Sequence, residues 1–197
     1  RNNPTGAVAG FEQLGRLVDY CNREGKLVIF DSAYARYIRD GGLPHSIYEI
    51  DGALECAIEI GSFSKEAGFT GMRLGWTVVP RRLHFSGEKS PWEIWNRRQT
   101  TKFNGASNVV QRGGLAALSD EGLRQTQETI DYYMGNADLV CACMRDVGLE
   151  YHGGRNAPMI WVRVPEEYDS WGFFNKMLEE ARVVCTPGAG FGPSGEG

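Results

Sequence analysis

The chain has 197 residues, of which 42% are hydrophobic and 23% are charged, and its formal net charge at pH 7 is −4. These proportions exclude a disordered or fibrous chain and are typical of a globular protein that buries a core as one or two domains. Basic residues are scattered among acids in short pairs such as Arg81-Arg82, so no continuous basic face is available for nucleic acid or anionic lipid. The lack of a basic face predicts no nucleic-acid partner. No apolar run approaches the roughly 20 residues of a membrane span, so we expect no membrane partner either.

The cysteine pattern predicts free thiols. Five cysteines stand at positions 21, 56, 141, 143 and 185 and form no even framework. Cys141 and Cys143 are two positions apart, so on a helix they point to different faces. We therefore expect five unbridged cysteines in a reducing compartment. The three histidines share no metal-ligand spacing, and we predict no metal site.

The first elements predicted along the chain are a helix and two strands. Apolar residues recur on one helical face from Phe11 to Cys21, and Gly25 is a typical helix end. The apolar runs 27–30 and 56–60 predict buried strands. This alternation favours an α/β fold, in which chemistry is usually found where the strands end.

A third strand and two helices follow. Residues 73–79 form an apolar run, which predicts a strand buried on both faces of a sheet. After Pro80 the pattern becomes helical over 92–101 and 106–118. Ser107 is a typical cap for the second of these helices.

The longest periodic segment, from about residue 121 to 147, predicts a helix whose length suits a bridge between domains. Short strands near Glu150 and at 159–164, a helix at 171–181 and a strand at 183–185 then indicate a smaller α+β unit. We place the domain boundary near residue 120, which gives expected domains of 1–120 and 121–197.

The functional hypothesis depends on Lys65. This residue ends the run Ser62-Phe63-Ser64-Lys65, and Arg73 follows eight positions later. The serines can donate hydrogen bonds to phosphate oxygens, and the guanidinium of Arg73 can hold a phosphate through two parallel bonds. A lysine amine attacks a carbonyl when desolvation or a nearby positive charge leaves it partly unprotonated. The pattern predicts a cradle for pyridoxal phosphate; the alternative is a polar loop with a solvated lysine.

Two further segments supply other parts of the same site. Asp31 directly follows the strand predicted at 27–30, and a carboxylate there can pair with a protonated ring nitrogen and make the ring an electron sink. Tyr34 and Asn3 can each donate a hydrogen bond to the ring oxygen of the cofactor. Asn3 belongs to the run Asn3-Pro4-Thr5-Gly6, which is also an ordinary turn signal.

In their order and spacing, these motifs resemble the fold-type I aminotransferases that use pyridoxal phosphate, and the resemblance covers all 197 residues. It implies an α/β fold in which residues 1–120 are the C-terminal part of a large mixed-sheet domain and residues 121–197 are an incomplete small α+β domain. Within this superfamily, residues 61–71, 97–108 and 156–162 look like the LL-diaminopimelate aminotransferases. That family transfers an amino group between LL-2,6-diaminopimelate and 2-oxoglutarate, giving tetrahydrodipicolinate and glutamate in lysine biosynthesis.

The resemblance assigns roles to the cofactor residues. It implies that Lys65 forms the Schiff base with pyridoxal 5'-phosphate and moves the proton, while Asp31 pairs with the pyridine nitrogen. Ser62, Ser64 and Arg73 would hold the phosphate, and Tyr34 would face the ring oxygen. We therefore expect Lys65, Asp31 and Tyr34 to be the catalytic residues.

Two asparagines are expected to reach the substrate as well as the cofactor. Asn3 would do so from the same subunit, and Asn104 would reach the site of the neighbouring subunit, which implies a homodimer with shared active sites. Asn108 is expected one helical turn from Asn104, so the choice between Asn104 and Asn108 stays open.

The resemblance implies a cytoplasmic enzyme in a bacterium or archaeon, or one of the plastid stroma in a plant or alga, with any targeting region upstream of Arg1. It also implies that the arginine for the substrate carboxylate lies outside positions 1–197, so we expect these residues alone to be inactive. Two alternatives stay open. One is another class I aminotransferase, acting on alanine, aspartate or aromatic amino acids, and the other is a non-catalytic regulatory domain that binds pyridoxal phosphate.

Overall fold

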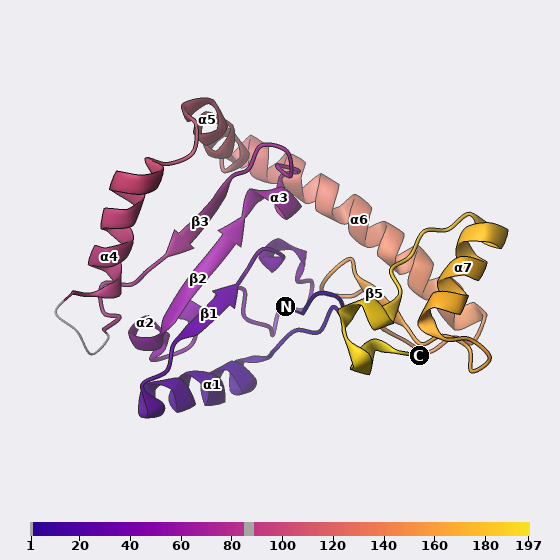
Figure 1. Ribbon diagram of the computed structural model, residues 1–197. Helices are drawn as coiled ribbons and strands as arrows, with labels where there is room; N and C mark the ends of the chain where they lie inside the picture. The colour runs from indigo at the N-terminus through magenta and orange to yellow at the C-terminus, as the bar shows by residue number, and fades with distance from the viewer. Residues whose placement is uncertain (1, 85–88) are drawn as a thin grey trace. The chain divides into compact units, whose positions relative to one another are not determined.

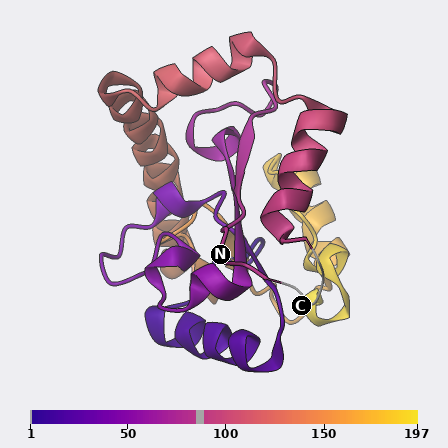
Figure 2. The same cartoon turned by 90° about the vertical axis from the view of Figure 1, so that its left-hand side faces the viewer.

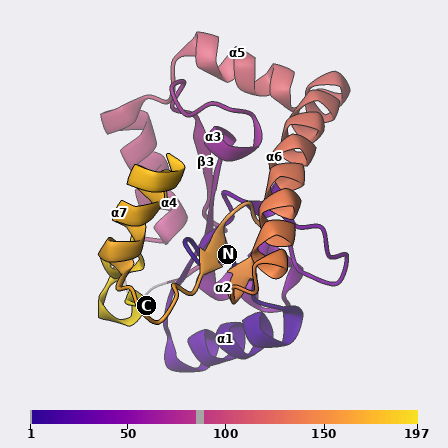
Figure 3. The same ribbon diagram turned by 90° about the vertical axis from the view of Figure 1, so that its right-hand side faces the viewer.

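The computed structural model describes residues 2–84 and 89–197, which form two compact units. The first unit is Val8–Met134, and the second combines Asn2–Ala7 with Gly135–Gly197. The helix α6 (Asp120–Asp146) is continuous, and its first part belongs to the first unit (Figure 3). The division falls inside α6, because Ile130 and Met134 of this helix pack with Tyr37 of the first unit. The expected domain ranges stay a prediction.

The first unit contains a three-stranded sheet of β1 (Val28–Asp31), β2 (Ala57–Ser62) and β3 (Gly75–Val78). Strands β1 and β2 are parallel, and β3 is antiparallel to β2 (Figure 1). The strands predicted at 27–30 and 56–60 are confirmed. Since β1 and β2 are parallel, their carboxyl ends lie at the same edge of the sheet.

Helix α1 (Phe11–Glu24) packs near the first residues of β1 and β2 and lies at the bottom of Figure 2. Its buried residues Leu14, Val18 and Cys21 share a core with the strand residues Val28 and Ala57. The residue after the helix, Gly25, has φ 59° and caps it in the left-handed conformation, which suits glycine. The predicted helix and its end are confirmed.

The prediction for the third strand is wrong in one respect. An apolar run at 73–79 predicted a strand buried on both faces, but β3 begins at Gly75 and most of its residues are exposed, with Trp76 at 38%. Strand β3 is an outer strand of the described sheet. An apolar strand is buried only where other elements pack on both of its faces. In the part of the chain that the structure describes, such packing on β3 is incomplete.

The other elements of the first unit are short or helical. They are α2 (Ala53–Cys56), α3 (Phe63–Glu66), α4 (Pro91–Arg98), a π-helical turn (Gln99–Phe103), α5 (Asn108–Ala117) and two 3-10 turns (Ala35–Tyr37 and Ile47–Glu49). Ser107 caps α5, because its Oγ accepts a hydrogen bond from the backbone N–H of Val110 at 3.4 Å. The helices predicted at 92–101 and 106–118 and this cap are confirmed.

The second unit contains a two-stranded antiparallel sheet, β4 (Tyr151–Gly153) and β5 (Ile160–Val162), and the helix α7 (Ser170–Ala181). Two 3-10 turns, Gly188–Phe191 and Pro193–Gly195, follow. The strand predicted at 183–185 is wrong. The backbone N–H of Val183 bonds to Met177 at the end of α7, and among the described residues no strand pairs with this segment.

All five cysteines are unbridged, as the sequence predicts. Cys141 is buried and Cys143 is exposed, which agrees with two thiols on different faces of α6. Over residues 2–84 and 89–197, no helix has the length and apolar character needed to span a membrane.

Candidate functional site

The predicted site begins at the shared edge of β1 and β2. Asp31 is the last residue of β1, and Ser62 is the last residue of β2. The carboxylate of Asp31 accepts a hydrogen bond from the backbone N–H of Ala33 at 2.9 Å, which orients it just beyond the strand. Parallel pairing thus brings Asp31 and the segment containing Lys65 to one edge, as expected.

Lys65 lies on the one-turn helix α3, which directly follows β2. The helix forms because Ser62 Oγ accepts a hydrogen bond from the backbone N–H of Ser64 at 3.1 Å and so caps its start. The side chain of Lys65 is exposed, so the desolvation expected for a reactive amine is not present in the described residues.

Two tyrosines, Tyr34 and Tyr37, contact Lys65. Its Nζ lies 5.7 Å from the ring centroid of Tyr34, within the range of a cation–π contact. The hydroxyl of Tyr37 donates a hydrogen bond to the backbone oxygen of Lys65 at 2.7 Å. The two tyrosine rings meet edge to face, with centroids 5.7 Å apart. The structure thus brings Tyr34 close to Lys65, and the expected role of Tyr34 at the ring oxygen stays a prediction.

Tyr37 was missed by the sequence analysis. It is 3% exposed and packs with Ile130 and Met134 of α6. The available signal was the spacing of three residues between Tyr34 and Tyr37, which places two aromatic rings on one side of a turn. Spacing alone does not reveal that the backbone oxygen of Lys65 accepts a hydrogen bond from Tyr37, because the two residues are far apart in sequence.

Arg73 is tied to the same segment by hydrogen bonds. Its φ is 61°, a left-handed conformation that is uncommon outside glycine. Its Nη1 donates to the backbone oxygen of Thr70 at 2.9 Å, and Thr70 Oγ1 donates to the backbone oxygen of Ser64 at 3.3 Å. The loop after α3 therefore returns Arg73 towards the segment that carries Ser64 and Lys65.

The two candidate asparagines lie in different elements. Asn104 follows the π-helical turn with φ 60°, and its backbone N–H donates to Gln99 at 2.7 Å. Asn108 is the first residue of α5. The expectation that they lie one helical turn apart is wrong, because the chain leaves the helical conformation at Asn104. Their proposed roles stay predictions.

Asn3 belongs to the second unit, so its role at the cofactor also stays a prediction. With Pro4 it lines a cavity of about 600 Å³ whose other walls include Met144, Trp161 and Phe173. Most of the residues that line this cavity are apolar.

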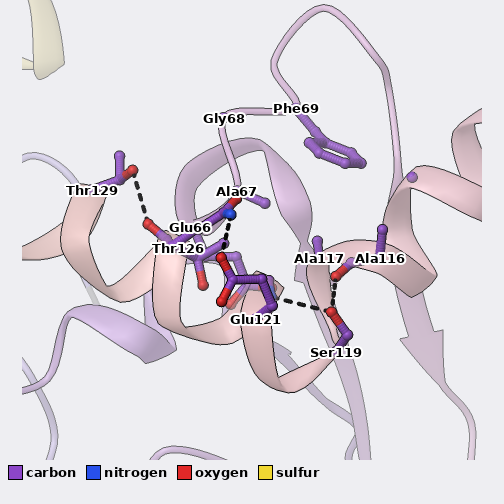
Figure 4. Close-up of a pocket in the computed structure, with 13 residues that line it drawn as sticks. Glu66, Ala67, Gly68, Phe69, Ala116, Ala117, Ser119, Glu121, Thr126 and Thr129 are labelled. Carbon is purple, nitrogen blue, oxygen red and sulfur yellow. Dashed lines mark hydrogen bonds between the residues drawn. The ribbon is translucent and has the colours of Figure 1, made fainter.

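A cavity of about 540 Å³ in the first unit lies beside the loop that follows Lys65 (Figure 4). Its walls come from residues 66–69 and from the corner between α5 and α6, where Ser119 Oγ donates to the backbone oxygen of Ala116 at 2.7 Å. Burial raises the pKa of Glu66, which lines the cavity, and Arg36 at 4.0 Å opposes this shift. The described residues that line the cavity include none of the predicted cofactor ligands.

Residues 1–197 match the family model of aminotransferase class I and II. The chain therefore belongs to the class I/II aminotransferase family, and the expected α/β fold of this family is confirmed.

Several relatives of this chain are named for one branch of that family. The LL-diaminopimelate aminotransferases of Prochlorococcus marinus (strain MIT 9211) and Bacteroides fragilis are 52% and 53% identical to this chain, and each match covers 100% of the chain and 49% of the relative. The solved structure of the L,L-diaminopimelate aminotransferase from Chlamydomonas reinhardtii has 49% identity and a TM-score of 0.92, over 100% of this chain and 48% of that one. An aromatic aminotransferase from Pyrococcus horikoshii has 28% identity and a TM-score of 0.83, over 99% of this chain and 51% of that one. The chain spans about half the length of these relatives.

Proposed function

We propose that the protein carrying this chain is a pyridoxal-phosphate-dependent aminotransferase that moves an amino group between LL-2,6-diaminopimelate and 2-oxoglutarate. The products are tetrahydrodipicolinate and glutamate, and the reaction serves lysine biosynthesis. The observation that carries the proposal is the meeting of Asp31, Tyr34 and Lys65 at one edge of the sheet. The chain's identity of 52–53% with enzymes named LL-diaminopimelate aminotransferase supports the choice of substrate.

The residues present fit the proposed cofactor by their chemistry. Lys65 offers an amine for an aldehyde, and Asp31 offers a carboxylate for a protonated ring nitrogen. Ser62, Ser64 and Arg73 offer hydroxyl and guanidinium donors for a phosphate, and the hydrogen bonds through Thr70 tie Arg73 to the serine segment. When bound, pyridoxal phosphate supplies the electron-withdrawing ring that stabilises negative charge at the α-carbon of an amino acid.

In this proposal each residue of the chain has a distinct task. The amine of Lys65 would hold the cofactor at its aldehyde carbon. Once the amino group of the substrate has replaced it there, the freed amine would take the proton from the substrate α-carbon and deliver it to that former aldehyde carbon. The carboxylate of Asp31 keeps the proton on the ring nitrogen. Tyr34 donates to the ring oxygen while its ring supports the side chain of Lys65, which lies 5.7 Å from its centroid.

The proposal extends to a homodimer with shared active sites, in which Asn104 reaches the cofactor and substrate of the neighbouring subunit and Asn108 is the alternative. Both asparagines are exposed, so both are accessible to a second copy. In this proposal Asn3 would contribute to binding the ring oxygen and the substrate in its own subunit. We place the enzyme in the cytoplasm of a bacterium or archaeon, or in the plastid stroma of a plant or alga.

The test is an absorbance scan of the complete gene product that carries residues 1–197. The protein is supplied with pyridoxal phosphate and mixed separately with LL-diaminopimelate, meso-diaminopimelate, glutamate, alanine and aspartate. We expect the yellow band of lysine-bound cofactor, and its loss with LL-diaminopimelate and glutamate only. A band that responds instead to alanine or aspartate would move the protein to another class I aminotransferase. The absence of any band would return Lys65 to a solvated surface lysine.

A further inference from the structure

We propose that Tyr37 is a positioning residue for Lys65, holding both the backbone of that lysine and the aromatic ring next to its amine. This inference rests on the proposed function and assigns a further residue to the same site.

The first contact is with the backbone of Lys65. The helix α3 has a single turn, so the carbonyl groups at its end have no partner inside the helix. The hydroxyl of Tyr37 donates to the carbonyl oxygen of Lys65 at 2.7 Å and supplies such a partner. Because the backbone of Lys65 determines where its side chain starts, this bond limits the positions that the amine can reach.

The second contact runs through Tyr34. The ring of Tyr37 meets the ring of Tyr34 edge to face at 5.7 Å, and the ring of Tyr34 lies 5.7 Å from the Nζ of Lys65. Tyr37 thus acts on Lys65 by two routes, one through the carbonyl group and one through the neighbouring ring. A residue needed only for packing would not require both.

Tyr37 is itself held rigidly. It is 3% exposed and packs against Ile130 and Met134 from the first part of α6. Burial raises its pKa to about 12, and Tyr133, Tyr34 and Glu66 add to the shift. The hydroxyl therefore stays protonated, and able to donate, at any pH at which an aminotransferase is assayed.

The chain offers a matched control in Tyr48. Its hydroxyl oxygen lies 3.1 Å from the backbone oxygens of both Ala57 and Val78, near the opposite end of β2, so its single proton donates to one of them or is shared between the two. Burial also raises the pKa of Tyr48 to about 12. Both tyrosines are thus protonated donors to backbone carbonyl groups, but only Tyr37 contacts Lys65.

The experiment compares Tyr37→Phe with Tyr48→Phe in the complete gene product loaded with pyridoxal phosphate. Thermal unfolding, the visible circular dichroism of lysine-bound cofactor, kcat and KM are measured for each. We expect both variants to lose some stability, because each removes a hydrogen bond to a partly buried carbonyl oxygen. Only Tyr37→Phe should weaken the visible circular dichroism and lower kcat, by roughly tenfold, with KM changed less than about twofold.

A third variant tests the support of Tyr37 without altering its hydroxyl. Ile130→Val shortens one side chain that packs on Tyr37 and should lower kcat by about twofold in the same direction. This variant also decides the matter if Tyr37→Phe does not fold, and an unchanged kcat and circular dichroism would then count against the proposal.

The outcomes separate this inference from the proposed function. If the wild type binds its substrate but Tyr37→Phe and Tyr48→Phe have the same kcat and the same circular dichroism, Tyr37 is merely structural and the inference is overturned. If the wild type shows no band with pyridoxal phosphate, the proposed function itself is overturned, and the inference with it.

Discussion

The two ends of strand β2 differ in what they do. At the amino end, Ala53, Cys56 and Ala57 are buried in the core with α1, and the hydroxyl of Tyr48 lies within hydrogen-bond distance of two backbone carbonyl groups. At the carboxyl end, Ser62 is only partly buried and Lys65 is exposed. The six residues of β2 thus connect a region that stabilises the fold with a region that presents polar side chains. Function and stability need different surroundings, so mutations at the two ends should have different effects.

Glu59 shows how the stabilising part of the strand is built. Its side chain is 4% exposed, yet it is not isolated. Its Oε2 accepts hydrogen bonds from Ser46 Oγ at 2.6 Å and from the backbone N–H of Ile47 at 3.0 Å. A buried carboxylate is tolerated when donors surround it, so Glu59 connects β2 to the turn at Ile47–Glu49.

The largest effect is expected at the functional end. Lys65→Ala removes the amine that we propose holds the cofactor and moves the proton, so turnover should fall by on the order of a thousandfold or more, while the melting temperature changes little because the side chain is exposed. Steady-state kinetics and thermal unfolding measure the two effects. Amino transfer at the wild-type rate by this variant would remove Lys65 from the mechanism.

The next effect is expected in the middle of β2. Glu59→Ala leaves the buried donors of Ser46 and Ile47 without an acceptor, and the free energy of unfolding should drop by about 2–4 kcal/mol. Glu59→Gln keeps an acceptor oxygen and serves as the matched control, with a smaller loss. Urea unfolding measures both. Equal losses in the two variants would show that hydrogen bonding is not what Glu59 contributes.

A smaller effect is expected where β2 meets β3. A Cβ atom on Gly61 would lie 2.0 Å from the ring of Trp76, so Gly61→Ala should force the ring to move and cost about 1–3 kcal/mol of unfolding free energy. Gly41→Ala is the control, because a Cβ there meets no heavy atom within 4 Å. Urea unfolding of both variants measures the difference. If the two alanine variants are equally stable, the close contact of Trp76 with β2 is not tight in solution.

The smallest effect concerns the pH dependence of Glu66, next to Lys65. Burial, opposed by Arg36, raises its pKa above the ordinary 4.5, so folding favours the protonated form. Below the pKa that Glu66 has in the unfolded chain, its contribution to stability is fully present. The contribution is lost as the pH rises from that value to the higher pKa of Glu66 in the folded protein. As the pH rises through this range, the variant Glu66→Gln should become progressively more stable than the wild type.

Unfolding in urea at several pH values from about 4 to about 7 measures this difference. The exposed residue Glu179 provides the control as Glu179→Gln. A stability difference between Glu66→Gln and the wild type that does not vary with pH would contradict the raised pKa.

Much of the site could be predicted because its signals are local. Helix α1 and strand β1 follow from apolar spacing and from a glycine at the helix end, which depend on neighbouring residues in the chain. Once the strands are known, parallel pairing brings Asp31 and Lys65 to one edge. The order of the motifs then indicates the aminotransferase family, and the match of residues 1–197 to the family model of aminotransferase class I and II agrees with that prediction.

Other features could not be predicted because they depend on distant residues. Nothing near 183–185 in sequence shows that this apolar segment has no strand to pair with. The exposure of Trp76 depends on which layers cover β3, and the left-handed conformation of Arg73 depends on the loop that closes back on α3.

By itself, the sequence determined the family, the strand ends and the residue types gathered there, since hydrophobic periodicity and motif order are written along the chain. Only the tertiary structure decided that Lys65 sits on a short helix and that Tyr37 holds it from a position 28 residues away. The physical reason is that a buried hydroxyl bonds to whichever carbonyl group the fold brings within reach, and that choice is made by packing across the chain.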